Sequence, residues 1–412
     1  MAKAQAKKIL LLTGIFYPDV FGGSGKLVYY HAKELVRQGF AVTVLTRKYK
    51  EEFPSHENLE GIEIYRYESK LNKIWGKSLT DIFVLPKIIK KFCQNTNFDL
   101  AMFYDEFQVN AFVKAKVNLP AIYVFLASYA QELALEGLER KTGIKFIDGL
   151  IKNIWVKILN KIEINNLKIA NKIVVLSEFS KKIILEILPQ IDKQKIKIIP
   201  GGVDLGLFTA PKDKNFLKTE LNLPLNKLVI LTVRRLVGRT GVDNLIAAVS
   251  QLKKVYPDFV LLIIGSGFLA AKLKTMVAEL NLQANVKFLG FIKENDLVKY
   301  YQAADLFVLP TLAYEGFGLA TLEALACGTP VLGTPVGATP EILSKINKSY
   351  ILAGNEPEAI FQGINNFIKQ KDKPENYNLS QQLRQFVIKN YSWTKSGQSL
   401  KEEIATLLGL TF

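Results

Sequence analysis

The sequence predicts an α/β protein made of two doubly wound, Rossmann-like domains that face a central cleft. A chain of 412 residues is too long for one ordinary hydrophobic core. Short apolar runs alternate with segments of helical periodicity, and the runs are continuously apolar, as in parallel strands buried on both faces. The same pattern starts again after a Pro-Gly-Gly turn at Pro200. Two βα arrays therefore follow each other along the chain.

The first domain is expected over residues 1–200. A strand in KKILLLTGIF comes first, and a helix over 25–39 follows it. Further strands are expected in FAVTVLT, FDLAMFY, AIYVFL and NKIVVLS. In such sheets ligands bind beyond the carboxyl ends of the strands, so the loops after these runs are the places to look for a site.

The second domain is expected over residues 201–385. Its strands are predicted in KLVILTVRRL, FVLLIIG, VKFLGF, DLFVLP and TPVLGTPV, and two of its helices over 242–255 and 269–280. Residues 386–412 are predicted to be helical and to pack back on the first domain. The cleft between two such domains is the expected binding site.

Composition and charge narrow the class of partner. The net charge of +16 lies mainly in the first half, which suggests phosphorylated small molecules, anionic lipid or nucleic acid. No Arg-rich patch with interleaved aromatic residues is present, so we expect no nucleic-acid partner. Cys93 and Cys327 are far apart and form no ligand pattern, which favours a reducing cytoplasmic location and no metal. No apolar run is long enough to cross a membrane.

Two glycine-rich stretches resemble nucleotide-binding loops but miss their requirements. A triphosphate-binding loop ending at Lys26 needs a glycine at Val20 and a hydroxyl residue at Leu27. Gly265-Ser-Gly-Phe-Leu-Ala follows a strand, as in dinucleotide folds, but the next strand ends at Gly290–Phe291 without an acidic residue. We therefore disfavour an NTPase and a dehydrogenase, and a tight strand-to-helix turn remains the alternative at Gly265.

The most informative stretch is DLFVLPTLAYEGFGLATLEALACGTPVLGT, residues 305–334. Glu315 stands in a loop between a strand and a helix expected to start at 317–318, and Glu323 lies on that helix. The helix N-terminus offers free N–H groups and a positive dipole end to a phosphate. Carboxylates beside a phosphate must face hydroxyl groups, so Glu315 is expected on a sugar and Glu323 on a ribose. The alternative is an ordinary helix with two solvated glutamates.

These segments resemble the retaining nucleotide-sugar glycosyltransferases of family 4, which have the GT-B fold. The resemblance rests on E-G-F-G-L-x-x-L-E-A-x-A-x-G-x-P-V and extends over nearly the whole chain. Tyr17-Pro18 with Gly22-Gly23, NNLKIANKIVVLSEFS, GGVDLGLF, VRRLVGRTGVDNLIAA and AADLFVLPT match the family's other segments in order and spacing. The reaction implied is sugar transfer with retained anomeric configuration.

The resemblance implies a set of donor-site residues. Arg235 and Glu315 would be catalytic, Arg235 on the donor diphosphate and Glu315 on the sugar hydroxyls. Glu323 would hold the ribose, and backbone N–H groups at the helix start would hold phosphate. The full donor set is Gly22, Gly23, Arg235, Arg239, Thr240, Gly265, Gly290, Phe291, Glu315, Gly316, Phe317, Gly318, Leu319 and Glu323. Without a D-x-D motif we expect no metal, and no cofactor besides a nucleoside-diphosphate sugar, with uridine as the expected base.

Two departures from the family pattern affect the activity. Thr240 stands where the family's phosphate-binding lysine is usual, with Arg239 beside it, and Leu126 stands where many relatives have a histidine. The only histidines, His31 on the first helix and His56 in a polar loop, are interpreted as structural or solvated. A catalytically silent relative that acts as a binding or partner subunit is therefore the alternative function.

The acceptor side is the least specific part of the sequence. Tyr104, Asp105, Leu126, Ser128 and Tyr129 follow strands of the first domain and are our candidates there. The acceptor is a hydroxyl of a lipid, a saccharide or a small molecule. Residues 146–168 form a basic amphipathic helix, which we interpret first as packed on the core with snorkelling lysines. The alternative is a helix on an anionic membrane, which would make the protein peripheral at the inner membrane surface.

Overall fold

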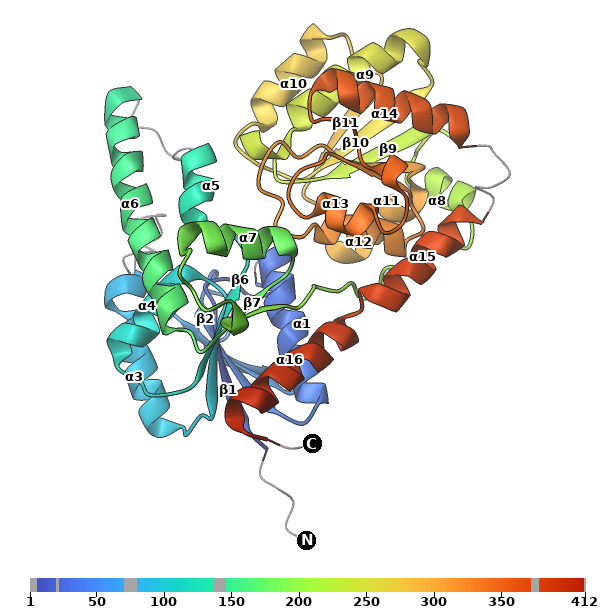
Figure 1. Cartoon of the computed structure of the whole chain (residues 1–412). Coiled ribbons are helices and arrows are strands. Elements are labelled where there is room, and N and C mark those ends of the chain that lie inside the picture. Colours follow the sequence, from blue (N-terminus) through green and yellow to red (C-terminus); the bar gives the residue numbers. More distant parts are fainter. Residues whose placement is uncertain (1–5, 20–21, 70–79, 137–144, 372–377, 411–412) are drawn as a thin grey trace. The chain divides into compact units, whose positions relative to one another are not determined.

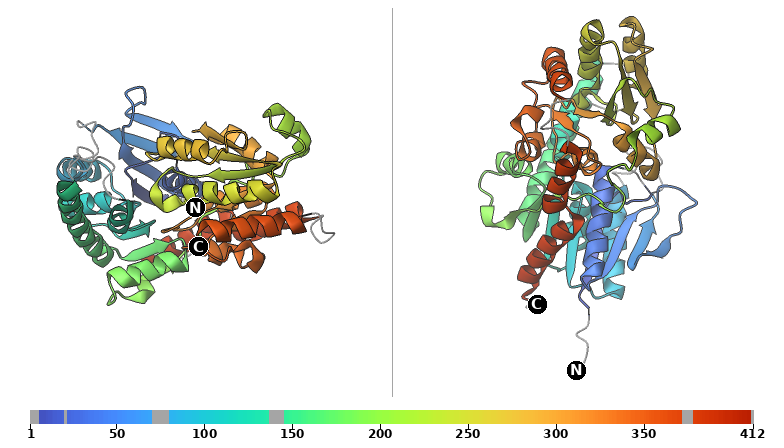
Figure 2. Two further views of the ribbon diagram at one scale, coloured as in Figure 1. Left: turned by 90° about the horizontal axis from the view of Figure 1, so that it is seen from above. Right: turned by 90° about the vertical axis from the view of Figure 1, so that its right-hand side faces the viewer.

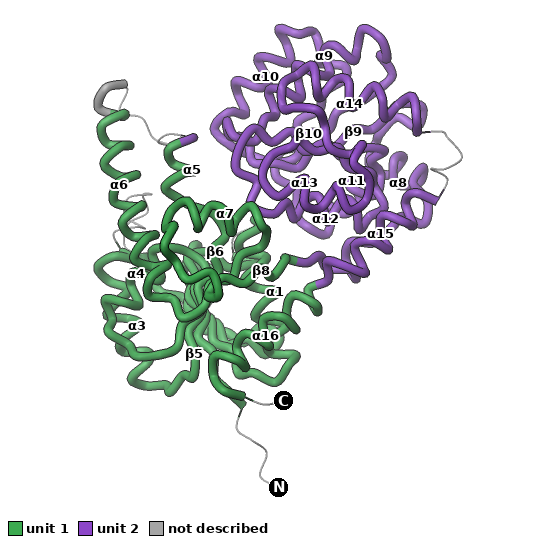
Figure 3. Tube along the Cα trace, in the orientation of Figure 1, with its two compact units in different colours: residues 1–134, 141–201, 393–412 green, residues 135–140, 202–392 purple. Residues whose placement is uncertain are grey.

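The computed structural model describes residues 6–19, 22–69, 80–136, 145–371 and 378–410. Its internal contacts divide the chain into two compact units (Figure 3). Unit 1 comprises Met1–Ala134, Lys141–Gly201 and Trp393–Phe412, and unit 2 comprises Leu135–Arg140 and Gly202–Ser392. Each unit is built around one sheet with helices packed against it (Figure 1). The predicted α/β class with two parallel sheets is confirmed.

Unit 1 contains an eight-stranded sheet in the order β3-β4-β2-β1-β5-β6-β7-β8. The pairings are parallel except β3 with β4, which is antiparallel. Its strands are β1 Lys8–Leu12, β2 Ala41–Arg47, β3 His56–Leu59, β4 Ile62–Tyr67, β5 Leu100–Phe103, β6 Ala121–Phe125, β7 Lys172–Val175 and β8 Ile196–Ile198. The central strands β1, β5 and β6 are buried along most or all of their length, which explains their continuous apolar sequence.

The helices of unit 1 include one from the far C-terminus of the chain. Among the described residues they are α1 Gly23–Arg37, α3 Leu85–Asn95, α4 Glu106–Ala115, α5 Tyr129–Glu136 (whose last two residues are assigned to unit 2), α6 Lys145–Ile169, α7 Glu178–Ile187 and α16 Trp393–Leu408. Figure 2 shows α16 and α1 side by side. The Trp393 ring stacks on Tyr30 with centroids 4.8 Å apart, and Gly397 lets the two backbones approach.

Unit 2 contains a five-stranded parallel sheet in the order β11-β10-β9-β12-β13. Its strands are β9 Leu228–Val233, β10 Phe259–Ile264, β11 Val286–Gly290, β12 Leu306–Leu309 and β13 Val331–Gly333. Its helices are α8 Lys214–Glu220, α9 Val242–Val255, α10 Ala270–Glu279, α11 Glu294–Ala303, α12 Leu319–Ala326, α13 Thr339–Leu343, α14 Pro357–Gln370 and α15 Leu379–Asn390. Helix α15 packs on α12, so it belongs to unit 2, whereas α16 belongs to unit 1.

The edge of the first sheet differs from the sequence prediction. Strands β3 and β4 were not predicted, because HENL and IEIYRY carry charged residues instead of a continuous apolar run. His56 was predicted in a polar loop, but it begins β3, where its Nε2 lies 2.6 Å from a carboxylate oxygen of Glu63. The edge strand β3 is partly exposed, and its neighbour β4 begins with alternating buried and half-buried residues, so neither produces a continuous apolar run.

Candidate active site

The carboxyl end of β9 runs on in extended form beside the loop after β10. The N–H of Arg234 donates to the carbonyl of Ile264, and the N–H of Leu236 donates to that of Ser266. A Cβ atom at Gly265 would lie 1.9 Å from the carbonyl oxygen of Arg234, and one at Gly267 would lie 2.3 Å from that of Leu236. Close packing of the two backbones at the carboxyl ends of β9 and β10 therefore requires glycine at both positions. This close packing is the tight strand-to-helix turn that the sequence offered as the alternative at Gly265.

Arg234 and Glu315 form a buried ion pair at this edge. Their side chains are 10% and 11% exposed, and Nη1 of Arg234 lies 2.8 Å from Oε2 of Glu315. Thr311 donates to the same carboxylate oxygen at 3.1 Å and accepts from Nη2 of Arg234. Nε of Arg234 is buried and makes no hydrogen bond within the described residues. Arg234 thus orients the predicted sugar-binding carboxylate and keeps one donor unused.

Arg235 is exposed, whereas Arg234 is directed at Glu315. The predicted role of Arg235 on a diphosphate stays a prediction, and Arg234 is a residue that the sequence reasoning missed. Its signal in the sequence was weak, because two adjacent arginines follow the strand and their side chains alternate in direction along an extended segment.

The loop that carries Glu315 is held in an uncommon conformation. Tyr314 has φ +65, which is unusual for a bulky residue. On the other side, a Cβ atom at Gly337 would lie 2.2 Å from the carbonyl oxygen of Glu315, and that carbonyl accepts from Ala338 at 2.8 Å. Strained backbone of this kind persists where the surrounding structure over-determines it, and it is concentrated at functional sites. Gly337 is a second residue that the sequence reasoning missed.

Helix α12 begins just after this loop with an uncapped N-terminus. Its N-cap is Gly318, with φ +91, and no side chain accepts from the first turn. Gly316 and Leu319 are half-buried on either side of the cap, while Phe317 packs edge-on to Tyr391 at 6.1 Å. No acidic residue lies in the first turn of α12. The N–H groups and the helix dipole therefore favour an anion here.

Glu323 lies a little more than one turn into α12 and is buried. Its Oε2 accepts from the hydroxyl of Tyr301 on α11 at 2.8 Å. Burial, followed by the charge of Glu323, raises the pKa of Tyr301 well above its ordinary range, so this tyrosine remains a donor at neutral pH. Glu323 is therefore held by a protein partner that sequence spacing did not indicate.

Thr240, which the resemblance places at the position of the usual lysine, and its neighbour Arg239 have different surroundings. Nη1 of Arg239 donates to the carbonyl of Tyr314 at 3.0 Å, which ties it to the Glu315 loop. Thr240 is buried, and its hydroxyl lies 2.8 Å from the carbonyl of Arg235 and 2.7 Å from that of Val237. Thr240 thus closes the turn after β9. The predicted contact of Thr240 with the donor stays a prediction.

The remaining predicted donor residues are exposed. Gly290 has φ +69 at the end of β11, and Phe291 after it is 56% exposed. In unit 1, Gly22 is the N-cap of α1 and Gly23 its first residue, and no side chain caps this helix. Both glycines are exposed, so the backbone N–H groups at the start of α1 face a surface of unit 1.

Comparison with known proteins identifies the family of this chain. Residues 213–384 match Glycosyl transferases group 1, and residues 21–207 match Glycosyltransferase Family 4. The two matches cover most of the chain, including β9, the Glu315 loop and α12. The chain belongs to glycosyltransferase family 4. By family it is a retaining enzyme that transfers a sugar from a nucleotide sugar.

The relatives match this glycosyltransferase over different shares of its length. An uncharacterised glycosyltransferase of Methanocaldococcus jannaschii is 25% identical over 94% of this chain and 95% of its own. A GDP-mannose-dependent monoacylated α-(1-6)-phosphatidylinositol monomannoside mannosyltransferase of Corynebacterium glutamicum is 38% identical, over 35% of this chain and 40% of its own.

Two solved structures have the same GT-B fold. Sucrose-phosphate synthase of Thermosynechococcus elongatus superposes with a TM-score of 0.82 at 21% identity, over 98% of this chain and 100% of that one. Anabaena HepE, solved with UDP and glucose, has a TM-score of 0.75 at 18% identity, over 97% and 100%. Identities at this level show the fold alone.

Among the predicted acceptor-side residues, Tyr104 is buried and Asp105 is half-buried. The hydroxyl of Tyr104 lies 3.1 Å from Nδ1 of His31, whose Nε2 lies 3.3 Å from Oγ of Ser396 on α16. Burial lowers the pKa of His31 to about 3, so it is neutral at physiological pH. His31 therefore joins α1, β5 and α16, which supports the structural interpretation of this histidine.

Asp105 is the N-cap of α4. It accepts from the N–H of Gln108 at 3.3 Å and from that of Gly14 at 2.6 Å. Burial, with the charge of Asp81 second, raises the pKa of Asp105 to about 6. Its contacts are those of a helix cap, and its predicted acceptor role stays a prediction.

The other acceptor-side candidates follow β6. Ser128 is buried and donates to Oε2 of Glu163 on α6 at 2.8 Å, and its hydroxyl accepts from Gln131. Tyr129 is 40% exposed, with its ring beside Phe107 at 6.3 Å, and Leu126 is half-buried. Of these residues, Tyr129 presents the most side-chain surface to solvent.

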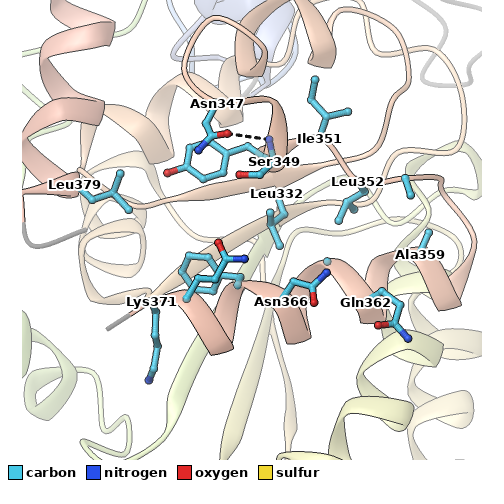
Figure 4. Close-up of a pocket in the computed structure, with 15 residues that line it drawn as sticks. Leu332, Asn347, Ser349, Ile351, Leu352, Ala359, Gln362, Asn366, Lys371 and Leu379 are labelled. Carbon is cyan, nitrogen blue, oxygen red and sulfur yellow. Dashed lines mark hydrogen bonds between the residues drawn. The ribbon is translucent and has the colours of Figure 1, made fainter. Parts of the chain in front are cut away.

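A separate pocket of about 310 Å³ lies in unit 2 between α14 and the segment after β13 (Figure 4). Amide side chains from α14, including Gln362 and Asn366, line it together with aliphatic residues such as Leu332 and Leu352. None of the predicted donor residues lines this pocket. This pocket is therefore separate from the candidate donor site at the carboxyl ends of β9 and β12 and the start of α12.

Proposed function

We propose that the protein transfers a sugar, with retention, from a UDP-sugar to a hydroxyl of a lipid-linked acceptor at a membrane surface. The main observation that supports this donor site is the buried Arg234–Glu315 pair next to the uncapped N-terminus of α12. Cations and N–H groups there suit a diphosphate, and the carboxylates of Glu315 and Glu323 suit sugar and ribose hydroxyls.

In the proposed reaction, the bond between the anomeric carbon and the β-phosphate oxygen breaks, and a bond to the acceptor oxygen forms on the same face. The acceptor proton goes to an oxygen of the leaving diphosphate. Arg235, the unused Nε of Arg234 and the N–H groups at Phe317–Leu319 stabilise the negative charge that develops on the leaving group. Glu315 holds the transferred sugar in position for this step.

The proposed base and acceptor are supported by the similar proteins and by helix α6. HepE, a structure of the same fold, was solved with UDP, whereas one relative is named for GDP-mannose. We propose uridine, with guanosine as the competing outcome. The lipid-linked acceptor is supported by the exposed basic and apolar face of α6 and by the phosphatidylinositol mannoside in the name of that relative.

A catalytically silent binding subunit is the second candidate. It is favoured by Thr240, whose hydroxyl is occupied in the turn, and by Leu126 in place of a histidine. The two candidates differ in turnover and agree in nucleotide binding, so activity separates them.

The test is nucleotide release from UDP-, GDP- and ADP-sugars, measured with and without vesicles of a polyprenyl or phosphatidylinositol-type lipid. We expect UDP release, faster with the lipid acceptor. The matched variant Glu315→Gln keeps the size of the side chain and is expected to lower release at least about 100-fold. UDP binding without release from any donor would favour the silent subunit, and preferential release of GDP would refute the uridine assignment.

A further inference from the structure

Helix α6 packs on unit 1 through one face and leaves the opposite face uncovered. Its buried face contains Leu159, which forms a core cluster with Phe107 and Ala130, and Glu163, which accepts from Ser128 and Ala130. On the other face Leu150, Ile154 and Ile158 are 53%, 49% and 41% exposed. The predicted packing on the core therefore describes only one face of this helix.

The uncovered apolar residues stand among lysines. Leu150, Ile154 and Ile158 follow each other at a spacing of four residues and form one stripe. Lys157, Lys161 and Lys168 are exposed on the same side of the helix. We call these six residues the α6 face. An aliphatic stripe with lysines beside it suits a surface that is apolar inside and negative outside.

The neighbouring helices extend the same chemistry. Helix α4 packs against both α3 and α6, so the three helices form one layer on unit 1 (Figure 1). Phe83, just before α3, is 66% exposed, and Nζ of Lys114 on α4 lies 5.7 Å from its ring centre. Among the described side chains of α3, α4 and α6, no Asp or Glu is exposed. The exposed charges of this layer are therefore positive.

We propose that the α6 face docks on an anionic lipid bilayer, with the stripe inserted at the headgroup boundary and the lysines on lipid phosphates. A second copy of the chain is a poor occupant, because it would bring lysines against lysines. Among the described residues no helix is long and apolar enough to cross a membrane. The contact is therefore peripheral and depends on salt. This inference rests on the proposed function only in so far as the membrane would contain the lipid-linked acceptor.

The test is sedimentation of the full chain with phosphatidylcholine vesicles, with and without about one-third phosphatidylglycerol, across a salt series and without donor. We expect binding only to anionic vesicles, weakening as salt rises. Lys157→Glu/Lys161→Glu should weaken binding at least about 25-fold, since each lysine near the surface contributes about fivefold. Ile154→Glu/Ile158→Glu should weaken it at least about tenfold.

Matched controls use exposed residues of unit 2. Lys254→Glu/Lys272→Glu has the same change in charge, and Phe216→Glu/Leu225→Glu replaces two exposed apolar residues, 65% and 57% exposed. Both controls should bind vesicles like the parent protein. All variants should keep the parent's circular dichroism and nucleotide release from donor alone, so a failure of docking is distinguished from a failure of the donor site.

Four outcomes would overturn the proposal. They are no binding to either vesicle, equal binding to neutral and anionic vesicles, equal loss in the α6 and unit 2 variants, and a dimer in solution that only the α6 variants dissociate.

Discussion

At the scale of single residues, the proposed donor site depends on the pairing of Arg234 with Glu315. Both side chains are buried, so removal of one partner leaves a charge without compensation. We expect Arg234→Met to lower the free energy of unfolding by about 3 kcal/mol, measured by urea denaturation. The double variant Arg234→Met/Glu315→Gln should recover part of that loss, because it removes both charges. Additive losses would mean that the two side chains do not interact.

The residue scale is also where sequence reasoning reached its limit. The motif predicted Arg235 as the diphosphate contact and gave no sign that the adjacent Arg234 pairs with Glu315. Tyr301, which donates to Glu323, lies 22 residues earlier in the chain, and no local spacing indicates that contact. Thr240 was recognised as a departure, yet its bonds to two carbonyls of its own turn depend on the turn geometry.

At the scale of elements, α16 is held on α1 by a close approach at Gly397. A Cβ atom there would lie 2.5 Å from Cβ of Glu34, which is a side-chain atom next to the backbone and has little room to move. We expect Gly397→Ala to destabilise unit 1 by about 1–3 kcal/mol, measured as a lower Tm. The matched control is Gly149→Ala on α6, where a Cβ atom meets nothing within 4 Å.

That control should stabilise the protein slightly, by about 0.5–1 kcal/mol, because alanine favours a helix over glycine. Equal effects of the two substitutions would show that α16 is not tightly packed on α1. A lower Tm for Gly149→Ala alone would contradict the described surroundings of both glycines.

Elements were predicted best where burial is complete. The helix over 242–255 was predicted with the bounds that α9 has, and β10 and β12 lie within their predicted apolar runs. The edge strand β3 and its neighbour β4 were missed because alternating charged residues do not produce a continuous run. For α6 the sequence offered two interpretations, and the structure shows one packed face and one exposed face.

At the scale of the whole molecule, the chain combines a unit with the proposed donor site and a unit with a basic, partly apolar face. The α/β class followed from the repeated βα pattern, and the family followed from motifs spread along the chain. Neither the βα pattern nor the motifs identify the donor base or the acceptor. A few side chains select each of them, and sequence patterns do not show which side chains are exposed.

The central claim is that the donor binds at the edge formed by β9, the Glu315 loop and α12. Hydrogen exchange, followed by mass spectrometry with and without saturating UDP, tests it most directly. We expect slower exchange in peptides that cover 234–240 and 314–323, with no change in peptides from α14. Protection confined to α14, beside the separate pocket of unit 2, would contradict the account.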